Sequence, residues 1–239
     1  MKTYSASQAY SAAQHGDAIR LNHETCKAYV NQVALDFADK VVLDVACGHE
    51  NPFFAERLRQ AKYVIGLDGD SREVQRNQMI QERHVGNIHA MPLANEIVDI
   101  DVSVDTIEHS VRPDLFLKEC HRVLRPGGQA IFTTPNLLGY KNAFAKFSGK
   151  SVFDFVWRVF HNRKLDYDTC YRCNTARVFR RRARETGFRV LEICYVPEIS
   201  WFLSKYPVAF TLAHAYNRIA AALGLEQLWG YMVVRVVKV

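Results

Sequence analysis

The chain has 239 residues and is 49% hydrophobic, 12% aromatic and 23% charged, which suits a medium-sized α/β domain with a substantial core. These figures exclude a disordered chain, a collagen-like repeat and a small disulfide scaffold. The 31 Lys and Arg exceed the 25 Asp and Glu by a net charge of +6, which permits an anionic partner without requiring one.

The sequence contains neither a secretory signal nor a membrane-spanning segment. Its N-terminus lacks an apolar stretch, and the run from Tyr206 to Asn217 has only 12 residues, whereas a spanning helix needs about 20. The six cysteines are scattered and fit reduced thiols better than a secreted framework. We therefore expect a cytoplasmic protein, attached at most to a membrane surface.

Helices and strands are predicted to alternate through the first half of the chain. A helical stretch over 23–39 leads into 41–45, a short β-branched run typical of a strand buried on both faces. Four further elements follow: a helix over 53–62, a strand over 63–68, a helix over 71–80 and a strand over 85–89.

The second half continues this alternation. Apolar residues over 98–104 alternate with Asp99, Asp101 and Ser103, a polar set that is unusual in a buried parallel strand. These carboxylates either gather at the strand ends or have partners elsewhere. The remaining predicted elements are a helix over 113–124 stopped by Arg-Pro-Gly-Gly, a strand over 129–134, a helix over 175–186, and strands over 188–196 and 231–239.

Repeated strand–helix units predict a Rossmann-like α/β fold: a seven-stranded, mostly parallel sheet with helices on both faces and an antiparallel last strand. Two aromatic-rich segments, 138–173 and 198–229, interrupt the regular alternation. We interpret them as cap insertions within a single domain that spans residues 1–239.

The loop after the first strand, with the sequence DVACGHENP, is the candidate cofactor site. Ligands of open α/β sheets bind beyond the carboxyl ends of the strands, and Gly48 lets the backbone approach a ligand closely. Asp68 ends the second strand 20 residues later, where a carboxylate can accept bonds from both ribose hydroxyls. A dinucleotide site is disfavoured because the loop lacks the G-x-G-x-x-G pattern. S-adenosylmethionine, which carries a sulfonium and no phosphate, fits better.

Five segments in order resemble the class I S-adenosylmethionine-dependent methyltransferases, in the broad group that contains the quinone-biosynthesis enzymes. They cover most of residues 41–195, and they are VVLDVACGHENP, VIGLDGD, GNIHAMPLANEIVDIDVSVDTIEH, FLKECHRVLRPGGQAIFTTPN and TARVFRRRARETGFRVLEI. A single glycine-containing loop is weak evidence, whereas five ordered matches are specific.

The resemblance implies that Asp44, Ala46, Cys47 and Gly48 hold the methionine part of the cofactor, mostly through backbone groups. It also implies that Asp68 binds the ribose.

On the adenine side, the resemblance implies that Asn87 contacts the amino group, that Ile88 packs on the ring, and that Val104 lies near the cofactor. The sequence departs from the family at Ala46 and Glu50, where Gly is common, and at Asn87, where Asp is common.

The candidate for proton transfer is His109, which follows the fourth strand and whose imidazole could accept a phenolic or hydroxyl proton. The alternative is that Glu108 and His109 only line the pocket. Asp105, Glu108 and His109 also resemble a metal-binding set of some quinone O-methyltransferases, but we expect no metal because the Glu-His pair recurs without one. Cys170 and Cys173 form half of a zinc motif, and we interpret them as free thiols.

The acceptor side is aromatic and basic. Residues 144–164 combine Phe and Trp with Lys and Arg. The simplest interpretation is a cap whose aromatic side chains pack on the domain, and the alternatives are closure over an apolar substrate and peripheral contact with an anionic membrane. We therefore predict methyl transfer to a small-molecule, apolar or lipid-linked acceptor. The alternatives are a non-catalytic binding module that has lost the cofactor through Glu50, and an RNA or protein methyltransferase. The arginines of 177–184 are expected to be a solvated helix face, which makes a nucleic acid the less favoured partner.

Overall fold

The computed structural model describes residues 26–30, 33, 35–147, 169–198 and 206–239, without the side chains of 144–146. The chain divides into two compact units. One unit contains the segments 1–29, 135–168 and 195–232, and the other contains 30–134, 169–194 and 233–239. Each predicted cap falls largely in the first unit. Of the predicted helix over 23–39, residues 26–30 and 33 are helical, whereas most of the basic segment 144–164 lies outside the described residues.

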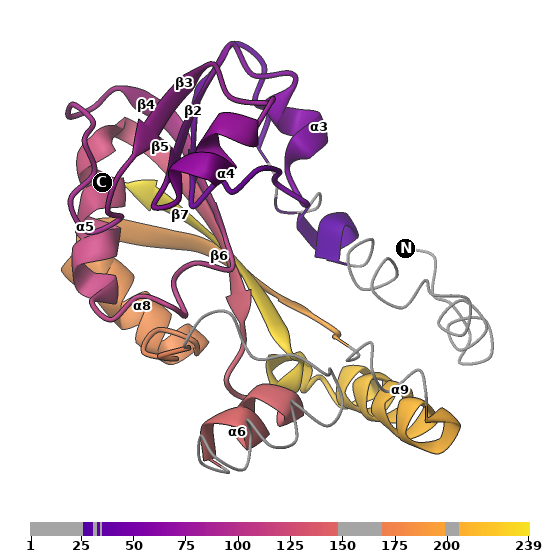
Figure 1. The fold of residues 1–239 in the computed structure, drawn as a ribbon. Coiled ribbons are helices and arrows are strands. Elements are labelled where there is room, and N and C mark those ends of the chain that lie inside the picture. Colours follow the sequence, from indigo (N-terminus) through magenta and orange to yellow (C-terminus); the bar gives the residue numbers. More distant parts are fainter. Residues whose placement is uncertain (1–25, 31–32, 34, 148–168, 199–205) are drawn as a thin grey trace. The chain divides into compact units, whose positions relative to one another are not determined.

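A seven-stranded sheet has the order β3-β2-β1-β4-β5-β7-β6 (Figure 1). Its strands are β1 (Val41–Val45), β2 (Tyr63–Asp68), β3 (Glu82–Val85), β4 (Val98–Val104), β5 (Leu124–Pro135), β6 (Phe188–Val196) and β7 (Tyr231–Lys238). The pairs β1–β2, β1–β4, β2–β3 and β4–β5 are parallel. The predicted sheet is therefore confirmed in its number of strands and in its parallel half.

The last strand is antiparallel, as predicted. The residue after β5 pairs with the residue before β7, because Asn136 N–H donates to the Gly230 carbonyl at 2.9 Å. The residue after β7 pairs with the residue before β6, because Val239 N–H donates to the Gly187 carbonyl at 3.3 Å. On each side of β7, the end of one strand lies beside the start of the other. Strand β7 therefore runs antiparallel to both β5 and β6.

Helices cover both faces of the sheet in the second unit. Figure 1 shows α5 (Pro113–Val123) and α8 (Ala176–Glu185) on one side, with α3 (Ala55–Leu58) and α4 (Ser71–Arg76) on the other. The helix starts have local causes: Asp70 accepts the Arg72 N–H at 2.9 Å, and Thr175 accepts the Val178 N–H at 3.4 Å. Pro113 occupies the first turn of α5, where its missing N–H is not needed.

The sequence-based bounds were wrong at four elements from residue 53 onward. The helices predicted over 53–62 and 71–80 end early, and α4 stops because Asn77 adopts extended backbone with ψ 114°. The strand predicted over 85–89 is instead β3, because the chain turns at the Asn87–Ala90 bridge. The strand predicted over 129–134 begins at Leu124, with a register irregularity between Val98 and Ile100.

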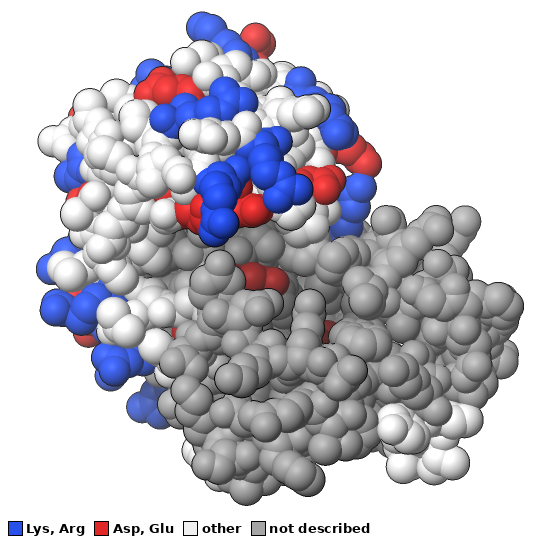
Figure 2. Space-filling model, in the orientation of Figure 1, with Lys and Arg blue, Asp and Glu red and all other residues white. Residues whose placement is uncertain are grey.

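Aromatic side chains build the core beneath α5 and α8. Phe132 of β5 packs against Phe116 at a centroid distance of 6.0 Å and against Phe179 at 5.5 Å, and all three are fully buried. Helix α8 buries Phe179 and Ala183. The expected solvated face is confirmed for Arg177, Arg180, Arg181 and Arg184, which are exposed, but it was wrong for Arg182, which is half-buried with a buried Nε. Figure 2 shows acidic side chains interleaved with basic ones on the described surface in view.

In the first unit, α6 (Tyr140–Phe147), α9 (Pro207–Ala222) and the 3-10 helix η3 (Glu226–Leu228) are joined through the chain around Gly230. Asn136 donates to the Trp229 carbonyl at 2.7 Å, and Asn142 donates to the Gly230 carbonyl at 2.8 Å. Lys141 forms an ion pair with Glu198. No helix in the described part of the chain is long and apolar enough to cross a bilayer.

Candidate functional site

Two residues of the loop after β1 adopt left-handed backbone. Ala46 has φ 56° and Gly48 has φ 49°. This conformation costs a non-glycine residue roughly 1 kcal/mol, so the departure from glycine at Ala46 carries a backbone cost as well as a steric change. At Gly48 an added Cβ would meet nothing within 4 Å, so open space faces the backbone where a ligand is expected.

Asp44 lies buried at the foot of this loop. Asn51 donates to its Oδ1 at 2.8 Å, whereas no described residue bonds to its Oδ2. Burial raises the pKa of Asp44 to about 7; the bond from Asn51 opposes this rise, and the charges of Asp101 and Asp68 add to it. A buried carboxylate oxygen without a protein donor fits a cationic or hydrogen-bonding ligand group.

Two asparagines that the sequence analysis missed hold the loop in place. Besides bonding Asp44, Asn51 accepts the N–H groups of Phe53 and Phe54 at 3.2 and 2.9 Å, which fixes the turn that precedes α3. Asn77 is fully buried and donates to the carbonyls of Cys47 and Gly48 at 3.2 and 3.1 Å. The only sequence signal for either was the Asn-Pro dipeptide at 51–52, which is typical of a turn.

Asp68 links the ends of β1 and β2. Its Oδ2 accepts the Gly48 N–H at 3.0 Å and its Oδ1 accepts the Asp70 N–H at 2.9 Å. Each carboxylate oxygen retains acceptor capacity after one such bond. The carboxylate is partly exposed, so both backbone bonds orient it while it remains accessible to hydroxyl donors.

The expected adenine-side residues form a tight turn after β3. Asn87 is exposed and its Oδ1 accepts the His89 N–H at 2.9 Å, while Ile88 is half-buried. Gly86 N–H donates to the Asp68 carbonyl at 3.0 Å, which ties this turn to the ribose candidate. The His89 ring contacts the Ser110 hydroxyl at 2.8 Å. The structure thus brings the chain around Asp68 and Asn87 together, as the resemblance implied.

The segment after β4 carries a second strained residue and a buried acid. Val104 is half-buried, and Asp105 has φ 49°. Glu108 is 2% exposed, and its Oε2 accepts the Thr134 hydroxyl at 2.8 Å, which in turn accepts the Asn174 amide at 2.8 Å. Burial, and then the charge of Asp105, raises the pKa of Glu108 well above its usual value.

The Cys170–Cys173 loop is fixed to the same segment. The Glu108 carbonyl accepts the N–H groups of Cys170 and Tyr171 at 2.7 and 3.2 Å. Both cysteines are free thiols, and burial raises the pKa of Cys173 to about 12. Within the described ranges no three His, Cys, Asp or Glu side chains group as metal ligands.

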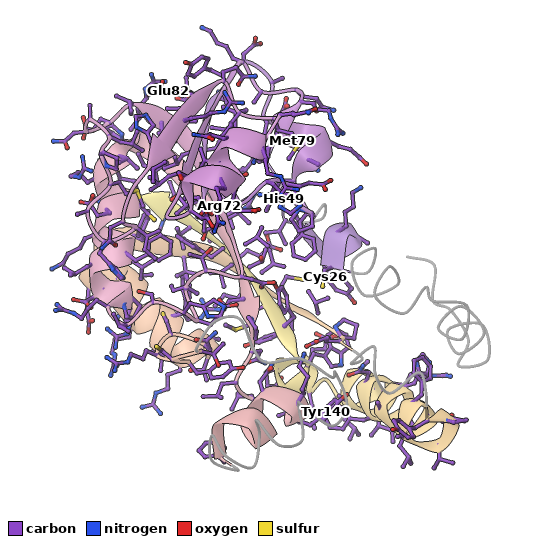
Figure 3. All side chains as sticks on the ribbon, in the orientation of Figure 1. Cys26, His49, Arg72, Met79, Glu82 and Tyr140 are labelled. Atoms are coloured by element: carbon purple, nitrogen blue, oxygen red, sulfur yellow. The ribbon has the colours of Figure 1, made fainter. Side chains whose placement is uncertain are left out.

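His49 lies on the outer side of the candidate cofactor loop (Figure 3). Its ring contacts Glu73 of α4 at 2.6 Å, and Arg76 contacts the other oxygen of that carboxylate at 3.3 Å. The neighbouring Glu50 is exposed. The His49 and Glu50 side chains therefore lie toward solvent. The carboxylates at the strand ends are Asp44 of β1 and Asp68 of β2.

A family profile described as "Methyltransferase domain" matches residues 43–132, the stretch that carries this geometry. This stretch of the chain therefore matches a methyltransferase domain. One relative is a Mycolicibacterium smegmatis protein named "Probable S-adenosylmethionine-dependent methyltransferase", 37% identical over 134 residues, or 54% of this chain and 48% of the relative. A ubiquinone biosynthesis O-methyltransferase from Pseudomonas syringae is 31% identical over 54% of this chain and 59% of its own length.

The chain thus spans about half the length of the curated relatives that it matches. Among solved structures, the geranyl diphosphate C-methyltransferase of Streptomyces coelicolor aligns with a TM-score of 0.60 and 11% identity, over 92% of this chain and 78% of that chain. A [4+2]-cyclase aligns with a TM-score of 0.56 and 15% identity, over 90% and 80%. At such identities the likeness shows the fold alone, and a cyclase on the same fold shows that activity depends on the site.

Proposed function

We propose that this protein transfers the methyl group of S-adenosylmethionine to a small-molecule acceptor that is apolar or lipid-linked. The observation that carries the proposal is the pair of strand-end carboxylates. Asp44 has a buried oxygen to which no described residue bonds, and Asp68 is oriented by two backbone N–H groups with acceptor capacity left. Such a pair suits a ligand with a cationic end and a ribose.

The residues present fit this cofactor. Asp44, Ala46, Cys47 and Gly48 would hold its methionine part, Asp68 the ribose, and Asn87, Ile88 and Val104 the adenine side. The open space beside Gly48 supports this assignment, because any side chain there would obstruct the approach. Glu50 is exposed, which counts against the alternative of a binding module whose cofactor loop that side chain blocks.

When bound, the cofactor supplies an electrophilic methyl group on a sulfonium, which leaves as a neutral thioether. The protein's part is to orient the acceptor and exclude water. For a hydroxyl acceptor, we propose that His109 accepts the proton, since it is half-buried in the segment after β4. The buried Glu108 would position this segment through Thr134 and the Cys170 loop.

The acceptor class has support from relatives. Besides the ubiquinone biosynthesis enzyme, a fatty-acid O-methyltransferase of Mycolicibacterium smegmatis is 32% identical over 124 residues, or 47% of this chain and 44% of that protein. Both names specify apolar or lipid-like acceptors. The aromatic composition of 138–173 and 198–229 agrees with such a substrate.

The test has two steps. Calorimetry with S-adenosylhomocysteine should give micromolar or tighter binding to the wild type, and a Asp68→Ala variant should bind much more weakly. Transfer of labelled methyl into a lysate that is fractionated into lipid, small-molecule, protein and RNA pools should then label the lipid or small-molecule pool. Absence of cofactor binding would refute the enzyme, whereas label in protein or RNA would refute the acceptor class.

A further inference from the structure

Exposed apolar side chains concentrate in the first unit. Of the fourteen large hydrophobic side chains that are exposed in the described ranges, nine belong to 135–147 and 206–225, although the other unit has many more described residues. Scattered exposed hydrophobics are normal, but a concentration on one small unit marks an interaction surface.

Helix α9 presents most of this surface as a single stripe. Val208, Leu212, Ile219 and Leu223 are 74, 65, 60 and 65% exposed. Their spacing of 4, 7 and 4 residues places them on one side of a helix with 3.6 residues per turn. Its buried residues, Phe210, Ala213, Asn217 and Ala220, lie on the opposite side. The helix is therefore apolar on two faces, of which the fold buries one.

Helix α6 extends the same surface. Tyr140, labelled in Figure 3, packs edge-to-face on Tyr216 of α9 at a centroid distance of 5.3 Å. At the other end of α6, Phe147 is 79% exposed. The two helices thus contact each other, and both carry large exposed apolar side chains.

The charge of these segments has one sign. Residues 199–225 contain no Asp or Glu, whereas they contain Lys205, His214 and Arg218. Residues 141–164 contain six Lys and Arg against one Asp. A seam between two copies of α9 is normally flanked by charges of both signs, and this helix offers no carboxylate to pair with Arg218. An anionic bilayer surface supplies both the apolar layer and the negative charge.

We propose that the outer face of α9, formed by Val208, Leu212, Ile219 and Leu223, docks on an anionic lipid surface. The four side chains insert at the level of the headgroups, and Arg218, which is exposed on the same helix, meets the lipid phosphates. The docking itself is independent of methyl transfer, whereas its use in reaching a lipid-like acceptor rests on the proposed function.

The test is sedimentation of the full chain with vesicles of phosphatidylcholine, with and without phosphatidylserine. We expect binding to the anionic vesicles, which weakens as salt is raised. The double variant Leu212→Ser/Ile219→Ser should lower the vesicle partition coefficient by about tenfold or more, because it removes apolar area from the interface. Its matched control is Val85→Ser/Val111→Ser, two residues of the other unit that are 53 and 52% exposed, which should bind as the wild type does.

Circular dichroism melting and S-adenosylhomocysteine calorimetry on the same variants separate the two proposals. A double variant that keeps its melting temperature and cofactor affinity but no longer sediments supports docking, even if methyl transfer is absent. Wild-type protein that does not sediment, or a double variant that sediments fully, overturns it. A wild-type dimer that the double variant converts to a monomer, without lipid binding, would assign the face to a second copy instead.

Discussion

The substitution Asp101→Asn should make the protein more stable at alkaline pH. Asp101 lies on β4 and is fully buried, and neither carboxylate oxygen has a hydrogen bond of normal geometry among the described residues. Burial raises its pKa to about 7, and the adjacent Cys120 thiol lowers it only in part. Folded protein therefore keeps a proton on Asp101 at pH values where the unfolded chain has lost it.

The sign and size follow from this difference. Between the unfolded value of 3.8 and the folded value of about 7, the native state binds more protons than the unfolded state, so stability falls as pH rises. A shift of about three units corresponds to about 4 kcal/mol at most, since each unit is worth about 1.4 kcal/mol. Asparagine cannot ionise, so this loss disappears in the variant. Because the charge of Asp101 also raises the pKa of Asp44, part of the second penalty disappears too.

Urea unfolding at pH 5 and pH 8 measures the effect. Asp99→Asn is the matched control, two residues earlier on the same strand. Burial raises the pKa of Asp99, but bonds from Val41 N–H at 2.8 Å and Arg125 at 2.6 Å outweigh it and lower the pKa overall. This control should therefore lose stability at pH 8 relative to wild type. An Asp101→Asn variant with the wild-type pH slope, or with lower stability at pH 8, would refute the reasoning.

Three further substitutions test the site. Asp68→Asn should weaken S-adenosylhomocysteine binding by about 10- to 100-fold, because hydrogen bonds to a charged acceptor are worth about 1.5–3 kcal/mol. Asp70→Asn should leave this affinity unchanged. Equal losses of affinity in calorimetry would contradict the ribose role of Asp68. Gly66→Ala should lower the free energy of unfolding in urea by about 1–3 kcal/mol, because the added Cβ would overlap the Ile80 side chain. The control is Gly69→Ala, whose Cβ would meet nothing within 4 Å. Equal unfolding curves for the two variants would contradict this packing. Glu108→Gln keeps an acceptor for the Thr134 hydroxyl, so the cofactor affinity should persist. The kcat should fall about tenfold and its pH profile should change, because glutamine cannot ionise. A parallel loss of cofactor affinity would indicate a purely structural role for Glu108.

The central strands could be predicted from the sequence because their residue types indicate burial. The bounds 41–45 and 63–68 match β1 and β2, whose residues are mostly buried aliphatics. Strand β3 was misplaced because it is a short edge strand, Glu82–Val85, in which apolar and polar residues give no clear pattern. Its true position depends on the turn at 87–90, a tertiary feature.

The polar pattern of β4 has two physical explanations, which the sequence left as alternatives. Asp99 has partners, in Arg125 and the Val41 N–H, at one end of the strand. Asp101 lacks such bonds, and burial raises its pKa to about 7, so its neutral form persists to higher pH than that of an exposed carboxyl. No local pattern distinguishes these outcomes, since the partners come from residues 26 and 58 positions away.

The loop-holding asparagines were not predictable for the same reason. Asn77 donates to carbonyls of loop residues that lie 29 and 30 positions earlier, and no periodic pattern of the sequence predicts such a contact. The candidate carboxylates, in contrast, were found because strand ends are visible in the sequence and the family motif repeats their spacing. Sequence reasoning therefore located the acids of the site but not the amides that fix their geometry.

The environment of Asp44 leads to a last prediction that distinguishes the cofactor from its product. With a pKa of about 7, Asp44 is partly protonated at neutral pH, and a cation bound beside its free Oδ2 would lower that pKa and release the proton. Calorimetry at pH 7 in phosphate and Tris should therefore show up to about half a proton released per site. Release should be larger for S-adenosylmethionine than for the product if the sulfonium is the nearer charge, and equal if the amino group is.

Asp44→Asn is the control for this measurement. The amide cannot titrate, so the variant should show the same apparent enthalpy in both buffers, while Asn51 can still bond to the oxygen of the new side chain. Persistent proton release in the variant would mean that another group titrates on binding. Buffer-independent enthalpy in the wild type would mean that Asp44 stays neutral beside the ligand, and the electrostatic basis of the proposed cofactor site would then be wrong.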